Sequence, residues 1–249
     1  MKAPKAIKPP PKWKEQYNAL QAFRKTFQAP VDTIGCDRLM IKEAPASIQR
    51  FHILLSLLLS SQTKDEVTAA AMNTLHTRLG HPSTGITIQH VLDASISDID
   101  ACICKVGFHR KKAQYMHQVA SILRQEHQGD VPDDLQTLLS LPGIGPKMAY
   151  LFLQAAYNRN DGIGVDTHVH RISKRLGWTS AAVHAKGPES TRQALEAWLP
   201  SAYWGEVNTL LVGMGQTVCA PIKPKCQDCA LNALCPSSTA KPPRKIRDD

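Results

Sequence analysis

Residues 141–147 read LPGIGPK, a Gly-Ile-Gly turn followed by a proline and a lysine. Pro146 suits the first position of a helix, where its missing N–H would have had no partner. We expect Gly143 and Gly145 to adopt positive φ angles and to expose backbone N–H groups, as in a phosphate cradle. Lys147 falls in the first helical turn, where the helix dipole disfavours a protonated amine. The stretch predicts a helical hairpin with an amine nucleophile, although a plain helix–helix turn with a solvated lysine fits it too.

The cysteines form a second and independent pattern. Cys36, Cys102 and Cys104 are scattered, whereas four others crowd together between residues 219 and 235. The crowded four are Cys219, Cys226, Cys229 and Cys235. Such a quartet indicates a ligand cage in a reducing compartment and not a disulfide framework. A single C-x-x-C flanked by lone cysteines fits four thiolates around an iron–sulfur cluster, with zinc or unliganded thiols as alternatives.

Together these motifs resemble the endonuclease III family of DNA glycosylase/AP lyases, within the helix-hairpin-helix glycosylase superfamily. The resemblance runs from about residue 20 to 236 and includes the hairpin, the lysine, the VDTH segment of residues 165–168 and the four cysteine spacings. Residues 60–65, which read SSQTKD, and residues 145–148, which read GPKM, are more similar to the eukaryotic branch of the family.

The helical pattern predicts an all-α protein. The resemblance implies that it folds into two lobes, with the active site in the cleft between them. The resemblance implies a six-helix barrel lobe that contains the hairpin, and a cluster lobe that holds a [4Fe-4S] cluster on the four crowded cysteines. The expected parts are a basic disordered tail over 1–18, the barrel lobe over 43–160, the cluster lobe over 19–42 plus 161–236, and a basic tail over 237–249.

Individual helices follow from apolar spacing and end signals. Residues 48–59 are apolar nearly all round, which predicts a central helix. Thr63 and Glu66 suggest a capping box for the next helix. Pro188 after Gly187 should open a later helix, and Gly213 or Gly215 should close the one that follows. A further amphipathic helix is predicted from Ala113, Met116, Ala120 and Leu123.

The resemblance also implies the chemistry. Unprotonated Lys147 would attack C1′ of a damaged nucleotide, displace the base and form a Schiff base, after which β-elimination breaks the strand. Asp166 would stabilise the cationic sugar or assist proton transfer, and a helix-capping role is equally compatible with its place before Thr167. His168 would help to position the site, although a histidine here is more often a structural hydrogen-bonding residue.

Two loops match the insertion elements of the family. Gln62 lies in the turn before Thr63, and Phe108 follows Gly107 ahead of a helix. Phe108 is either a wedge that enters the duplex or a core anchor. Basic residues placed where helix physics does not favour them are expected to neutralise phosphates, with solvated charge as the alternative. These residues are Arg110, Lys111, Lys112, Lys223 and Lys225.

Bulk properties agree with a DNA-repair enzyme. The net charge of +9 suits a polyanionic partner, here damaged double-stranded DNA. We expect a monomer with no membrane segment. The basic N-terminal tail is compatible with a nuclear address, a DNA-tethering arm or a plain solvated tail. The expected location is the nucleus, with the mitochondrion as a second compartment. A monofunctional adenine-mispair glycosylase and a non-catalytic DNA-binding module are the alternatives. The adenine-specific relatives lack the lysine and add a C-terminal domain, for which the residues after Cys235 leave no room.

Overall fold

The computed structural model describes residues 8–240; residues 1–7 and 241–249, the outer parts of the two predicted basic tails, lie outside the described residues. Within residues 8–240 the chain is helical, and its only β-type pairing is an isolated bridge between His81 and Gly85. The all-α prediction is therefore confirmed. None of the described helices is long and apolar enough to cross a membrane.

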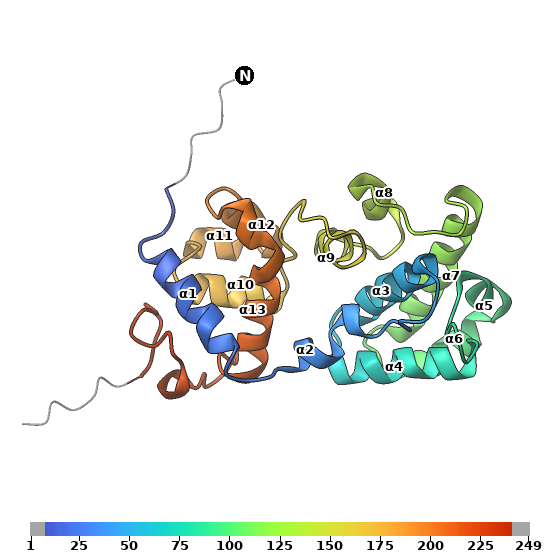
Figure 1. Cartoon of the computed structure of the whole chain (residues 1–249), viewed down its shortest axis with the longest axis horizontal. Coiled ribbons are helices and arrows are strands. Elements are labelled where there is room, and N and C mark those ends of the chain that lie inside the picture. Colours follow the sequence, from blue (N-terminus) through green and yellow to red (C-terminus); the bar gives the residue numbers. More distant parts are fainter. Residues whose placement is uncertain (1–7, 241–249) are drawn as a thin grey trace, which may run out of the picture. The chain divides into compact units, whose positions relative to one another are not determined.

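The chain divides into two compact units, each described here by itself (Figure 1). Unit 2 is one continuous segment, Pro30–Gly164, whereas unit 1 combines Met1–Ala29 with Val165–Asp249. The helices of unit 2 are α2 (Pro30–Ile34), η1 (Cys36–Arg38), α3 (Ala46–Ser60), α4 (Asp65–Arg78), α5 (Ile88–Asp93), α6 (Ile96–Ile103), α7 (His109–Glu126), α8 (Leu135–Ser140) and α9 (Pro146–Tyr157). Those of unit 1 are α1 (Trp13–Arg24), α10 (Thr167–Arg175), α11 (Ala181–Ala185), α12 (Pro188–Glu196), η2 (Ser201–Tyr203), α13 (Trp204–Thr217) and η3 (Cys226–Asp228).

The predicted boundaries between the parts need correction in two places. Residues 30–42 belong to unit 2 and not to the cysteine-bearing unit, because α2 and η1 pack on α4 and α3 and bring Leu39 and Met40 against their core. The predicted disordered tail is too long as well. Helix α1 already begins at Trp13, and Tyr17 is fully buried in unit 1.

Helix α3 is the centre of unit 2, as its composition predicts. Residues 51–59 are all buried, and α4, α7 and α9 pack around the helix. The predicted apolar face of α7 is buried as well, from Ala113 and Met116 to Ala120 and Leu123. Burial on this scale is the main favourable contribution to folding of the unit.

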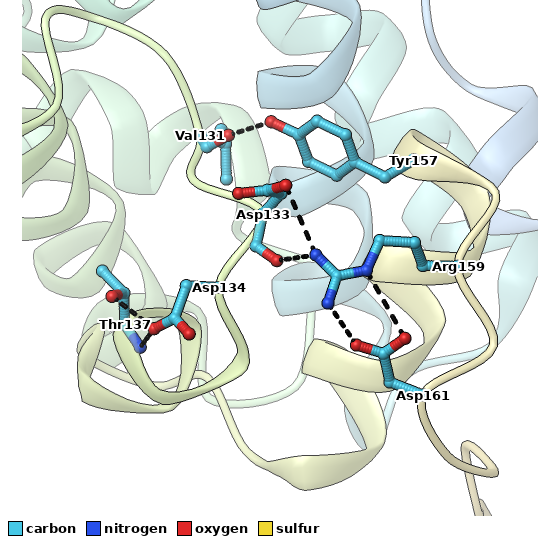
Figure 2. Close-up of polar contacts among 7 residues, drawn as sticks. All are labelled: Val131, Asp133, Asp134, Thr137, Tyr157, Arg159 and Asp161. Atoms are coloured by element: carbon cyan, nitrogen blue, oxygen red, sulfur yellow. Dashed lines mark hydrogen bonds and ion pairs between the residues drawn. The ribbon is translucent and has the colours of Figure 1, made fainter.

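Arg159, which follows α9, connects the end of that helix to other residues of unit 2 (Figure 2). The Arg159 guanidinium donates to the backbone carbonyl of Asp133 at 2.6 Å and to the carboxylate of Asp161 at 2.5 Å. The Tyr157 hydroxyl donates to the carbonyl of Val131 beside it. These bonds join the end of α9 to the loop before α8. Because the hairpin joins the other ends of α8 and α9, the two helices are connected at both ends.

Unit 1 is built around aromatic side chains and a buried amide. Trp178 donates from Nε1 to Gln16 Oε1 at 2.6 Å, and Gln16 in turn donates to the carbonyls of Leu176 and Leu234. The ring centroids of Tyr17 and Tyr203 lie 4.7 Å apart, edge to face. These contacts fasten α1 to segments that lie far along the chain.

Two predicted helix signals are wrong. Thr63 and Glu66 form no capping box, because α4 begins at Asp65 and Thr63 Oγ1 accepts instead from the backbone N–H of Gly107 at 3.1 Å. Helix α13 does start a short segment after the Pro188 helix, but it runs through Gly213 and Gly215 to Thr217. Those two glycines serve close packing and not helix termination.

Candidate active site

The hairpin that carries Lys147 lies between α8 and α9. Gly143 has φ 80°, and a Cβ there would lie 2.5 Å from the ring of Tyr115 and 3.0 Å from Leu58. Glycine is therefore required at this position both for its backbone conformation and for space. Gly145 differs from the prediction: its φ is −109°, an angle open to any residue, and it serves as the N-cap of α9. No atom lies within 4 Å of a Cβ built on Gly145, so the turn is open on that side.

Lys147 is the second residue of α9, directly after Pro146 at the first position. The lysine is half-buried, and its charge acts on two neighbours in unit 2. Burial raises the pKa of the Cys36 thiol, and the charge of Lys147 opposes that rise. Burial, and to a smaller extent the charge of Lys147, lowers the pKa of Lys112 to about 8. The nucleophile candidate thus lies in a region of unit 2 that already contains a buried cation and a thiol.

Asp166 lies in unit 1 as the N-cap of α10, where its Oδ1 accepts from the backbone N–H of Val169 at 2.8 Å. The predicted capping role is confirmed. His168 packs against α13, since a Cβ on Gly215 would lie 2.1 Å from His168 Nδ1. The same nitrogen lies 3.2 Å from Arg171 Nη2, so the structural role weighed for His168 is present.

The four crowded cysteines line one cavity in unit 1, which has about 40 Å³ of accessible space. Most of its other lining is apolar and includes Leu20, Ile172 and Met214. Burial raises the pKa of the Cys229 thiol, and the three other thiols raise it further, so all four are within electrostatic range of one another. Among the described residues, no group of three or more His, Cys, Asp or Glu side chains is arranged to hold a metal ion.

Arg175 is not among the predicted site residues, yet in the structure it contacts one of the four cysteines. Its Nη1 donates to Cys219 Sγ at 3.2 Å and to the Ala220 carbonyl at 2.7 Å, and its Nη2 donates to the Pro221 carbonyl at 2.8 Å. A guanidinium beside a cysteine sulfur supplies a charged hydrogen-bond donor to that sulfur. The feature of the sequence that could have indicated Arg175 is its position one helical turn after Arg171, in the helix that Asp166 caps.

The two predicted insertion residues are both at exposed loop tips of unit 2. Gln62 lies between α3 and α4 with φ 53°, and Phe108 lies between α6 and α7 with φ 57°. Phe108 is 66% exposed, which excludes the core-anchor interpretation.

Of the five basic residues predicted to contact phosphates, four are exposed in the structure and one is buried. Arg110, Lys111, Lys223 and Lys225 are exposed. Lys112 is buried, and its ammonium donates to the carbonyls of Leu59 and Ser61, so it is not free to meet a phosphate. Tyr115 was not predicted. It packs on Gly143, and its ring centroid lies 5.5 Å from the ammonium nitrogen of Lys111.

Comparison with known proteins agrees with this arrangement. The family model described as "HhH-GPD superfamily base excision DNA repair protein" matches residues 55–201, more than half of the chain. The helical architecture is similar to that of a solved non-covalent endonuclease III–DNA complex, with a TM-score of 0.72 at 23% identity over 90% of this chain and 95% of that one. The family model therefore identifies the chain as a base-excision DNA repair protein of the HhH-GPD superfamily, and the solved structure agrees with its fold.

Curated relatives specify the family. The chain is 46% identical to Endonuclease III-like protein 1 of Bos taurus over 229 residues, which cover 92% of this chain and 72% of the relative. It is 44% identical to the Endonuclease III homolog of Encephalitozoon cuniculi, covering 89% of this chain and 93% of that protein. The chain belongs to the endonuclease III family. The predicted class of enzyme, a DNA glycosylase with AP lyase activity, is thereby confirmed.

Proposed function

We propose that this enzyme removes oxidised or ring-saturated pyrimidines from double-stranded DNA, with Lys147 as the nucleophile and Asp166 as the assisting carboxylate. The observation that carries the proposal is the position of Lys147. It is the second residue of α9, next to a turn that is open at Gly145, in a chain that belongs to the endonuclease III family. A lysine at the positive end of a helix dipole is held there against its own electrostatic preference, which is typical of a functional residue.

The reaction follows from the chemistry of an amine. The lone pair of Lys147 Nζ forms a bond to C1′, and the base leaves with the electrons of the C1′–N bond and takes up a proton. The attacking nitrogen then loses a proton, and its lone pair opens the C1′–O4′ bond. O4′ takes up a proton to become a hydroxyl, and an iminium ion is left on the lysine. The iminium acidifies the C2′ proton, and its removal expels the 3′ phosphate by β-elimination. A water or hydroxyl nucleophile would stop at base removal, so the lysine accounts for both activities.

Asp166 has two parts to play in this proposal. As the N-cap of α10 it holds the start of that helix, and the bond from Val169 fixes the orientation of its carboxylate. A fixed carboxylate stabilises a cationic sugar and can move a proton to and from an amine. His168 acts only in support of this helix end, through its contacts with Arg171 and α13.

The DNA-contact role is proposed for the exposed residues alone. Phe108 and Gln62 would enter the duplex and fill the space that the extruded nucleotide leaves, which offsets the cost of a few kcal/mol for unstacking and unpairing. Phosphates would be neutralised by Arg110, Lys111, Lys223 and Lys225 and bound by the open hairpin at Gly143 and Gly145. Lys112 is left out of this set.

We also propose that the four cysteines hold a [4Fe-4S] cluster. The chemistry of the residues supports such a group, because four thiols line a single, largely apolar cavity and Arg175 donates to one of the sulfurs, although the four side chains are not arranged around one ion in this structure. When bound, a cluster on four thiolates would hold the loop from Cys219 to Cys235 in one conformation. The reaction proposed above requires no electron transfer.

Metal analysis tests the cluster. Protein purified without oxygen should contain about four irons and four sulfides per chain and absorb in the visible range. Replacing one ligand, Cys226→Ser, should lower iron content and lower the melting temperature, whereas Cys104→Ser, at an exposed cysteine outside the cavity, should change neither. Stoichiometric zinc in iron-replete preparations would favour the alternative ligand set instead.

Borohydride trapping tests the nucleophile and the substrate together. A duplex with thymine glycol, or with a plain abasic site, should give a reduced covalent adduct with the enzyme, and adenine opposite 8-oxoguanine should give almost none. Lys147→Gln should abolish the adduct while DNA binding stays near the wild-type level. Lys105→Gln, at an exposed lysine of the α6–α7 loop, is the matched control. A wild-type yield of adduct from Lys147→Gln would eliminate this lysine as the nucleophile.

We propose that the protein acts as a monomer in the nucleus, and in the mitochondrion as a second compartment. The large apolar side chains that are exposed in the described residues are scattered, at Ile96, Phe108 and Ile222. These three side chains of the described residues are too few to build the apolar core of an obligate dimer interface. The basic N-terminal residues support the proposed location.

A further inference from the structure

The two proposed insertion residues share an unusual backbone conformation. Gln62 and Phe108 both have positive φ angles, at 53° and 57°. A residue with a Cβ is strained in this region, more so when it is bulky and aromatic, and it stays there only where its surroundings hold it. Both side chains are exposed, so the force that holds them must come from the loop backbones.

The loops of Gln62 and Phe108 are joined directly to each other. The backbone N–H of Gly107 donates to Thr63 Oγ1 at 3.1 Å. A Cβ on Gly107 would lie 2.7 Å from the carbonyl oxygen of Gln62, so the two backbones approach too closely for any other residue at this position. The residue before Phe108 therefore packs on the backbone of Gln62.

Lys112 adds the strongest link between these loops. Its side chain is 4% exposed, and its ammonium donates to the carbonyls of Leu59 at 2.8 Å and Ser61 at 2.7 Å and lies 3.4 Å from Thr63 Oγ1. Its backbone N–H donates to the carbonyl of Phe108 at 3.0 Å. One residue is thus bonded to the loop that carries Gln62 and to the residue at the tip of the other loop.

The chemistry of this contact explains why a charged group is buried here. The acceptors are carbonyls at the C-terminal end of α3, where the helix dipole is negative and the last carbonyls lack helical partners. A buried ammonium with its donors satisfied by such carbonyls forms charge-assisted bonds, which are stronger than neutral ones. Burial lowers the pKa of Lys112 to about 8, with a smaller contribution from Lys147, and the protonated form therefore still predominates near neutral pH.

We infer that Lys112 is a positioning residue that locks the Gln62 loop to the Phe108 loop, so that both side chains enter the duplex as one rigid element. This inference rests on the proposed insertion of Gln62 and Phe108 into DNA. Lys112 itself does not touch the DNA. Its role is to keep the two strained residues in the conformations that aim their side chains outward, so that no ordering of the loops is needed when the base is extruded.

The test measures duplex distortion and not activity alone. A 2-aminopurine is placed opposite an uncleavable abasic analogue, and the rise in its fluorescence on protein binding reports its unstacking. Lys112→Met keeps the length of the side chain and removes the ammonium. It should slow the fluorescence rise by about tenfold, the effect of losing roughly one charge-assisted hydrogen bond. Lys105→Met, which removes an exposed charge from the Phe108 loop, should have a much smaller effect.

A double-mutant cycle separates positioning from general stability. In a Phe108→Ala, Gln62→Ala background, Lys112→Met should cause no further slowing, because the side chains that it positions are gone. The melting temperature should fall by the same amount in both backgrounds. An unchanged rate in Lys112→Met, or an equal slowing in the background without the two side chains, would overturn the inference.

A second variant and the wild-type control distinguish the remaining outcomes. If Lys112→Met does not fold, Thr63→Val removes the hydroxyl shared by Gly107 and Lys112 at nearly constant volume and should slow the rise in the same direction. A wild-type rate in Thr63→Val would then overturn the inference. If the wild-type protein itself produces no fluorescence rise, the proposed insertion fails, and with it the role of Lys112. If the wild-type rise is normal and the variants match it, the proposed insertion of Gln62 and Phe108 is retained and only the positioning role of Lys112 is excluded.

Discussion

At the scale of single residues, the structure gives several side chains two roles that the sequence alone could not separate. Asp166 is the clearest case, because its cap to Val169 is visible in the structure and its carboxylate is also proposed to assist Lys147. Both roles require an oxygen acceptor, but only the second requires a negative charge. That difference allows a clean test.

Asp166→Asn should keep the cap, since asparagine is as good an N-cap as aspartate, and should leave the melting temperature close to wild type. The same change removes the charge, so base removal should slow by roughly a hundredfold or more. Asp166→Ala should lose both functions and cost about 1 kcal/mol of stability in addition. Single-turnover rates and thermal melts of the two variants would be compared, and full activity of Asp166→Asn would leave Asp166 with the cap alone.

Lys112 shows what can and cannot be predicted at the residue scale. Residues 110–112 are three consecutive basic residues, which suggests one basic patch. The helical phase distinguishes them, because Lys112 falls on the same stripe as Met116 and Leu123, both buried, whereas Arg110 and Lys111 do not. The phase could therefore have warned of burial. The carbonyls that receive the ammonium come from α3, and their arrival is a tertiary event that no local pattern contains.

At the scale of elements, the sequence predicted the helices with strong apolar periodicity and failed where glycine has more than one use. Helices α3 and α7 were predicted from their buried faces, and the Pro188 start of α12 from its backbone chemistry. The hairpin was found from its glycines, although only Gly143 has the expected positive φ. The predicted helix end at Gly213 or Gly215 is wrong, because a helix stop and close packing use the same residue and the structure uses both glycines for packing.

The packing of α13 on α10 should make Gly215 intolerant of even one methyl group. A Cβ there would lie 2.1 Å from His168 Nδ1, so Gly215→Ala should destabilise unit 1 by about 1–3 kcal/mol. The gain of up to about 1 kcal/mol in helix propensity is too small to offset this. Urea unfolding of the variant measures the loss. Adding His168→Ala should recover part of it, and a double variant no more stable than the sum of the single changes would contradict this contact.

At the scale of the whole molecule, the buried His52 beside the half-buried His76 should make stability depend on pH. Burial, followed by the charge of nearby His76, lowers the pKa of His52 to about 4, and burial also lowers the pKa of His76. The ring of His52 donates and accepts inside unit 2, with Ile86 O at 2.7 Å and the Ile41 N–H at 3.3 Å. The folded protein therefore holds this ring neutral under conditions where the unfolded chain would protonate it.

His52 titrates near 6.5 in the unfolded chain, so between about pH 6.5 and 4 the unfolded state binds more protons than the folded state. The stability is fully present above this window and is lost as the pH falls through it, by up to about 3 kcal/mol for His52. Urea unfolding across that range should show this slope. His52→Gln should be less stable near neutral pH but have a flatter slope, and equal slopes in the two proteins would assign the dependence to other groups.

The division of the chain into a continuous and a discontinuous unit has a consequence for biosynthesis. Unit 2 is one uninterrupted segment and can complete its core while the ribosome is still translating later residues. Helix α1 is made first, yet the partners of Gln16, at Leu176, Trp178 and Leu234, are made much later. Until then the aromatic face of α1 stays unpaired on the nascent chain. Vectorial synthesis should therefore produce a long-lived half-folded species in which α1 is the segment open to chaperones and proteases.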